Sequence, residues 1–167
     1  MITEDYVSFE IAKLLKEKGF KTWCYKSYGT AVYHKGVPIS FDEECELKDE
    51  GLEDEIEYVE GGYLYDFGYG NKKEDANVYA APTLQMAMKW LREVYNIIID
   101  VSPLSFNTKG SESFICNNWV FTLWENGNPI VSEFYGNQTA YPTYEEACES
   151  AIKCGLENLI ENDRKIL

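Results

Sequence analysis

The spacing of apolar residues predicts three amphipathic helices separated by strands. The first is expected over Thr3–Lys18, where apolar residues recur at the spacing of one helix face, with Gly19 ending it. The second is expected to start after Ala81, with Pro82 suited to its N-terminus, and to close at Asn96. The third opens at Pro142. A threonine follows each of these prolines and can cap the helix with its hydroxyl oxygen.

The strands before the second helix are expected from aromatic and β-branched runs. Phe20–Tyr25 reads as a strand, Tyr28–Thr30 as a turn and Ala31–His34 as the returning strand. Tyr63–Tyr69 then alternates aromatic residues with others at a period of two. On one strand, this alternation would place all of its aromatic rings on the same face.

Three strands are expected between the second and third helices. Ile97–Val101 is continuously apolar, which predicts burial on both faces or a central place in the sheet. Trp119–Trp124 and Ile130–Phe134 flank Asn126-Gly127, the preferred pair for a type I′ hairpin turn. The C-terminal half therefore has the order α-β-β-β-α.

These elements predict one α+β domain over residues 1–167. We expect an antiparallel sheet of about five or more strands, packed by the three helices. The expected core consists of apolar residues from the helical stripes and central strands: Leu14, Leu15, Leu84, Ala87, Leu91, Ile97, Ile99, Phe121, Leu123, Ala147, Ala151 and Ile152.

Composition places the chain among folded cytoplasmic proteins. Its 167 residues are 45% hydrophobic and 15% aromatic, which suits a domain with a substantial core. No apolar run is long enough to cross a membrane, and the acidic N-terminus lacks the features of a signal peptide. The five cysteines are odd in number and contain no Cys-x-x-Cys pair, so no disulfide framework is expected.

The net charge of −14 is concentrated in one segment. Residues 42–60 hold eleven acids and one lysine, a net charge of −10, and form an acidic insert. Such a block usually stays solvated, but it can also dock a basic partner by long-range attraction. Two sets of residues are therefore candidates for partner binding: the aromatic Tyr63, Tyr65, Phe67 and Tyr69, and the acidic Glu53, Asp54 and Glu55.

No catalytic or metal-binding pattern emerges from the sequence. His34 is the single histidine, and no Gly-x-Ser-x-Gly motif or phosphate-binding glycine loop accompanies it. Cys24, His34 and Cys45 are spaced unlike common zinc ligands. We therefore expect no enzymatic activity, no cofactor and no metal.

The α-β-β-β-α order is similar to that of double-stranded-RNA-binding domains. Ala147 and Ala151 in the last helix are spaced as in that family. The family places lysines at the start of this helix, where the present chain has Glu145 and Glu146. Because these carboxylates would repel phosphates, no nucleic-acid binding is expected.

A second resemblance involves the helices. Ala81–Glu93, with Tyr6–Glu10 before it and Tyr144–Ala147 after it, resembles small uncharacterised proteins of Bacteroides-type gut bacteria and their phages or mobile elements. The family has no established activity, so the resemblance implies an intracellular accessory role and no particular site.

Three functions remain open at the level of sequence. The first is a non-enzymatic protein that binds an unknown protein partner through a sheet edge or an aromatic surface. The second is an acidic decoy whose residues 42–60 occupy a nucleic-acid-binding protein. The third is an enzyme of unrecognised type. The sequence does not fix the oligomeric state, whether a small ligand binds, or whether the acidic insert is ordered.

Overall fold

A computed structural model describes residues 5–66, 68–71, 77–106, 114–132 and 140–166. The backbone forms two compact units: unit 1 combines Met1–Phe20 with Pro82–Leu167, and unit 2 is Lys21–Ala81. The α+β class is confirmed, but the described strands form two antiparallel sheets, of four and three strands, where one sheet was expected. A single domain over residues 1–167 stays a prediction.

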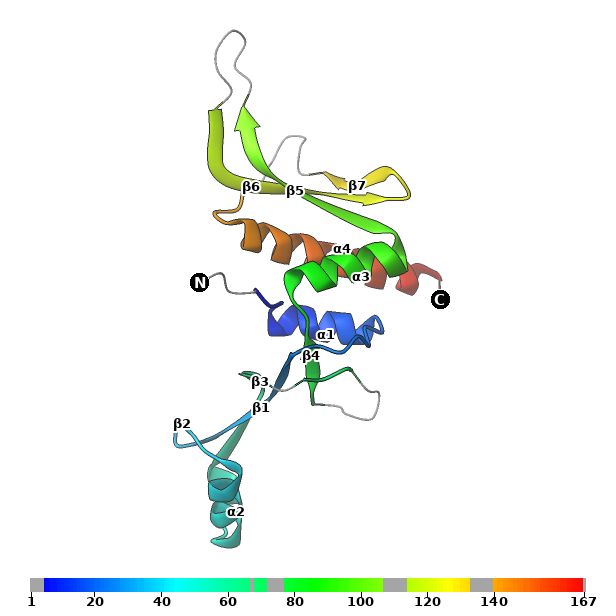
Figure 1. The fold of residues 1–167 in the computed structure, drawn as a ribbon. Coiled ribbons are helices and arrows are strands. Elements are labelled where there is room, and N and C mark those ends of the chain that lie inside the picture. Colours follow the sequence, from blue (N-terminus) through cyan, green and yellow to red (C-terminus); the bar gives the residue numbers. More distant parts are fainter. Residues whose placement is uncertain (1–4, 67, 72–76, 107–113, 133–139, 167) are drawn as a thin grey trace. The chain divides into compact units, whose positions relative to one another are not determined.

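Unit 1 contains the expected α-β-β-β-α order. Its elements are α1 (Phe9–Glu17), α3 (Leu84–Tyr95), β5 (Ile97–Phe106), β6 (Phe114–Glu125), β7 (Asn128–Ser132) and α4 (Tyr144–Ile166). The strands form an antiparallel sheet in the order β5-β6-β7. Helices α3 and α4 lie against this sheet, and α1 packs against α4 (Figure 1).

The expected core is largely confirmed. Of the twelve predicted residues, ten are buried, whereas Leu14 and Ile99 are partly exposed. The prediction for Ile97–Val101 was wrong, because β5 lies at the edge of its sheet. Ile97 is buried, but the next side chain, Ile98, is 45% exposed, as expected when helices cover only one face of a sheet.

The helix termini in unit 1 follow local chemistry except at the start of α1. The hydroxyl oxygens of Thr83 and Thr143 accept hydrogen bonds from the third backbone N–H beyond each cap. Gly19 has a φ of +87° just after α1, as expected. However, α1 starts at Phe9 and not at Thr3, which lies outside the described residues.

The late start of α1 has a tertiary cause. The backbone N–H of Val7 donates to the carbonyl oxygen of Pro82 at 3.0 Å, and that of Leu84 donates to the carbonyl oxygen of Asp5 at 3.0 Å. The chain before Ser8 is therefore held extended beside the start of α3. Val7 is fully buried there, so apolar contact as well as hydrogen bonding opposes a longer helix.

The hairpin between β6 and β7 is confirmed. Asn126 and Gly127 have φ of 51° and 81°, the left-handed values of a type I′ turn. Asn96 also has a left-handed φ of 56° after α3, and its amide nitrogen donates to Oδ1 of Asn126 at 2.6 Å. One hydrogen bond thus connects the end of α3 to the hairpin turn. Phe134, the expected end of the last strand, lies outside the described residues.

Unit 2 is built around one central strand. Its elements are β1 (Lys26–His34), β2 (Val37–Pro38), α2 (Phe41–Asp49), the 3₁₀ helix η1 (Glu53–Glu55), β3 (Ile56–Tyr65) and β4 (Tyr79–Ala81). Strand β1 pairs with β3 on one side, and with β2 and β4 on the other.

The expected turn at Tyr28–Thr30 was wrong, because these residues lie inside β1. The chain instead reverses at Lys35-Gly36, whose φ values of 51° and 77° are left-handed. Phe20–Tyr25 is also not a regular strand. Only Cys24 within it forms a bridge, with Tyr69.

In the described part of the chain, no helix is long and apolar enough to cross a membrane.

Candidate functional site

The acidic segment 42–60 is folded into α2, η1 and the first half of β3. Ser40 begins α2 with a capping box: its hydroxyl oxygen accepts the N–H of Glu43, whose carboxylate accepts the N–H of Ser40 at 2.7 Å. These hydrogen bonds from Ser40 lower the pKa of the Glu43 carboxyl. No residue of α2 is buried, and all of its acidic side chains except that of Glu44 are exposed to solvent.

Two acids of this segment form defined ion pairs. Lys48 Nζ lies 2.6 Å from Oε1 of Glu44, which also accepts the hydroxyl of Tyr58 at 2.7 Å. Oε2 of Glu55 lies 2.8 Å from Lys35 Nζ and 2.9 Å from His34 Nε2. These neighbours hold the pKa of both carboxyls below the usual value, through the hydrogen bonds to Lys48 and Lys35 above all.

The acidic candidates Glu53, Asp54 and Glu55 make up η1, and all three are exposed. Glu55 is held by the ion pair with Lys35 and by the hydrogen bond with His34. Glu53 and Asp54 have no ion pair with a described residue. The three residues thus form a solvated turn, in which only one carboxylate is fixed.

The residues considered for metal binding lie in different surroundings. Cys24 is buried, which raises the pKa of its thiol to about 11, whereas Cys45 is exposed on α2. His34 contacts Glu55. Among the described residues, no three His, Cys, Asp or Glu side chains come together as a metal ion would require.

The aromatic candidates are separated by the structure. Tyr63 and Tyr65 lie near the end of β3, with ring centroids 4.6 Å apart, and are 57% and 40% exposed. Tyr69 is only 7% exposed and forms its backbone bridge with Cys24. Phe67 lies outside the described residues. Of the three aromatic candidates that the structure describes, Tyr63 and Tyr65 therefore share an exposed surface and Tyr69 does not.

Tyr65 is fixed by its contact with β1. Its ring lies over Gly29, where an added Cβ would come within 2.8 Å of Cε2 of the ring. Its hydroxyl donates to the carbonyl oxygen of Thr30 at 3.3 Å. Gly29, which suggested a turn in the sequence, thus allows the ring of Tyr65 to lie close to β1.

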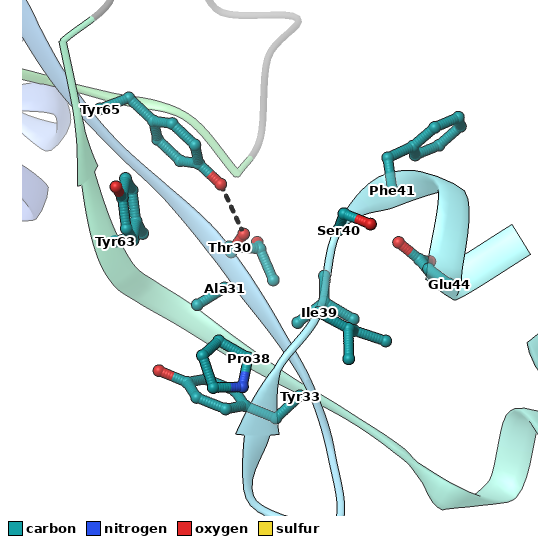
Figure 2. A pocket seen from close by; sticks show the side chains of 11 residues that line it. Thr30, Ala31, Tyr33, Pro38, Ile39, Ser40, Phe41, Glu44, Tyr63 and Tyr65 are labelled. Atoms are coloured by element: carbon teal, nitrogen blue, oxygen red, sulfur yellow. Dashed lines mark hydrogen bonds between the residues drawn. The ribbon is translucent and has the colours of Figure 1, made fainter.

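Tyr63 and Tyr65 form one wall of a groove of about 540 Å³ (Figure 2). Its other residues come from β1, from β2 and the connection that leads into α2, and from α2 itself: Thr30, Ala31, Val32, Tyr33, Pro38, Ile39, Ser40, Phe41 and Glu44. Four of the lining residues are aromatic, and Glu44 is the single charged one. The groove can therefore take an apolar or flat cationic group, but it lacks convergent acid and base groups for catalysis.

The groove includes residues that the sequence analysis missed, among them Tyr33 and Phe41. One signal was available for Phe41: Ser40-x-x-Glu43 is a capping-box pattern that places residue 41 in the first turn of a helix. No comparable local signal existed for Tyr33, whose place in the groove depends on strand pairing.

Unit 1 has a hollow of its own, of about 520 Å³, and four of its lining residues are acidic: Asp5, Glu145, Glu146 and Glu149. Oε1 of Glu149 accepts the N–H of Ser8 at 2.7 Å. Glu145 and Glu146 lie in the first turn of α4, where negative charge complements the helix dipole. Glu145 and Glu146 occupy the positions where a double-stranded-RNA-binding domain would carry lysines.

Comparisons of the chain with known protein families, curated proteins and solved structures gave no match.

Proposed function

We propose that the protein is a non-enzymatic interaction protein that works in the cytoplasm and binds another protein through unit 2. The observation that carries this proposal is strand β3. It is ten residues long, contains no buried residue, and pairs with β1 alone among the described strands. An exposed edge strand offers backbone N–H and C=O groups to a strand of another chain.

The distribution of exposed apolar residues supports the same unit. Of the eleven large hydrophobic residues that are exposed in the described part of the chain, eight lie in unit 2. They include Tyr63 and Tyr65 on β3 and Phe41 on α2. Aromatic residues are enriched at protein interfaces, since their rings bury much area at a small entropic cost.

The resemblance of the helices to proteins of Bacteroides-type bacteria and their phages supports an accessory role in such a host. We also propose that nucleic acid is not a partner, because the chain carries a net charge of −14.

Site-specific photo-crosslinking in the native host would test the proposal. A benzophenone amino acid at Tyr63 should crosslink to a discrete partner, because this side chain is exposed beside the β3 edge. The matched control is the same group at Val94 on α3, which is 56% exposed against 57% for Tyr63. The purified partner should then slow hydrogen exchange of the β3 amides.

Equal crosslinking from both positions, or none from Tyr63, would contradict the proposal. If a purified partner binds but does not change the hydrogen exchange of the β3 amides, the interface lies elsewhere.

A second candidate function is an acidic decoy for a nucleic-acid-binding protein. The ordered carboxylates of α2 favour it: the helix has no buried residue, and five of its nine residues are acidic. Replacing Asp42, Glu46 and Asp49 by amides should leave the fold intact, because solvated charges add little stability. Under this hypothesis the same change should slow association, and binding of a captured partner should weaken with salt. Partner binding that neither the amide substitutions nor added salt weakens would exclude the decoy function.

A further inference from the structure

One ring in the groove of unit 2, that of Tyr65, is held in place before any partner binds. Tyr65 lies over Gly29 and donates to the carbonyl oxygen of Thr30, and Tyr63 packs beside it (Figure 2). Tyr33 and Phe41 contribute two further rings. Because part of this aromatic surface is already ordered, a ligand would lose less free energy in arranging it.

The charge beside these rings is negative. Glu57 on β3 is the cross-strand neighbour of Tyr33, so the two side chains share one face of the sheet. Glu57 is exposed and forms no ion pair with any residue that the structure describes. Unit 2 as a whole has fourteen acidic and six basic residues, a net charge of −8.

We infer that the groove binds an extended segment of the partner protein that carries an arginine or lysine side chain. This inference rests on the proposed function and names the partner's chemistry. The aliphatic stem of the side chain would lie against Tyr33 and Tyr63, and its cationic head would approach Glu57. Cations are attracted to aromatic faces, and long basic side chains bury their stems on apolar surfaces.

A second copy of this chain fits the groove less well than a basic segment. Two units of charge −8 would repel each other, and pairing two β3 strands would bring Glu57 and Glu60 of both copies to one interface. An acidic or neutral segment would leave Glu57 without a counter-charge. Charge complementarity therefore selects the basic occupant.

Peptide binding to the full-length protein tests this inference. The probe is a short peptide that alternates arginine with threonine. In the control peptide citrulline replaces arginine, which keeps the shape and removes the charge. The arginine peptide should shift the backbone amide signals of Ala31 and Tyr63 but not that of Val94. Citrulline should weaken binding about tenfold, through loss of the cation–π and ionic contacts.

Two matched substitutions separate the groove from general attraction to an acidic protein. Glu57→Gln should weaken binding of the arginine peptide about threefold. Neither glutamate lines the groove, but Glu57 is opposite Tyr33 on β3, whereas Glu53 lies in η1. Glu53→Gln removes the same charge and should change binding much less. Tyr63→Ser should weaken binding about fivefold without changing the fold, because this ring is mostly exposed.

The inference is overturned if the arginine peptide does not bind, if citrulline binds equally well, or if Glu53→Gln and Glu57→Gln have equal effects. It is also overturned if the groove signals shift only as the protein dimerises, which would make a second copy the occupant. Failure of this inference is distinct from failure of the proposed function. If Tyr63 crosslinks to a partner but the protein does not bind the arginine peptide, the interaction role is retained and only the basic character of the partner segment is rejected.

Discussion

The ring of Tyr65 lies over Gly29, so close that a Cβ atom at residue 29 would come within 2.8 Å of the ring carbon Cε2. The two residues belong to neighbouring antiparallel strands and are diagonal neighbours on one face, since Tyr65 is opposite Ser27 and Tyr63 opposite Gly29. The absence of a side chain at residue 29 therefore gives Tyr65 its place in the groove wall.

This contact predicts that Gly29→Ala displaces the Tyr65 ring. The φ of Gly29 is not in the left-handed region, so alanine is tolerated by the backbone and only the ring is in the way. We expect a loss of about 1 kcal/mol in the free energy of unfolding, measured by denaturant titration. The peptide of the groove test should also bind more weakly.

The control is a double-mutant cycle with Tyr65→Ala. Once the ring is absent, Gly29→Ala should cost little or become favourable, because alanine suits a strand better than glycine. An equal loss in both backgrounds would show that the close contact is not the cause.

Two glycines of unit 1 should respond to alanine in opposite directions. Gly127 has a φ of +81° in the hairpin turn, so Gly127→Ala should lower the free energy of unfolding by about 1 kcal/mol. Gly155 is buried inside α4, where a Cβ would meet Ile97, Leu91 and Leu123 at ordinary distances of 3.8 to 4.0 Å. Gly155→Ala should raise the free energy of unfolding by about 1 kcal/mol. Denaturant titration of both variants checks the signs, and a loss at Gly155 would contradict the packing described here.

The contacts of Glu55 with Lys35 and His34 predict a pH-dependent contribution to the stability of unit 2. Lys35 and His34 lower the pKa of the Glu55 carboxyl in the folded chain, so its contribution is present above the pKa of the unfolded state. The contribution is lost as pH falls through the lowered pKa of the folded state. Glu55→Gln should therefore destabilise the protein at neutral pH, and the difference from the unsubstituted chain should shrink in acid.

Denaturant titrations across the acid range measure this difference. Glu53→Gln is the matched control, because Glu53 lies in the same turn without an ion pair to any described residue. A difference for Glu55→Gln that stays constant with pH would contradict an ionic origin.

Nucleic acid should not bind the protein. The net charge of −14 opposes encounter with a polyanion, and Glu145 and Glu146 occupy the first turn of α4. Micromolar protein should leave the electrophoretic mobility of duplex RNA and DNA unchanged at low salt, where attraction is strongest. A retarded band would show that a local basic surface outweighs the overall charge.

Features that depend on residues close together in the chain were predictable from the sequence. The caps at Thr83 and Thr143, the left-handed Gly19 and the Asn126-Gly127 turn involve groups only a few positions apart. The apolar stripes of α3 and α4 likewise identified most of the core, because burial of a helix face follows from its periodicity.

Tertiary structure decided the features that join distant residues. The sequence suggested a turn at Gly29, but this residue lies in β1, next to the ring of Tyr65, which follows thirty-six positions later in the chain. The extended chain before α1 depends on two backbone hydrogen bonds near the start of α3: Val7 donates to Pro82, and Asp5 accepts from Leu84. The groove depends on the pairing of β1 with β3. Strand pairing is set by contacts across the sheet, and a local pattern contains no information about which strand, or which ring, will lie opposite.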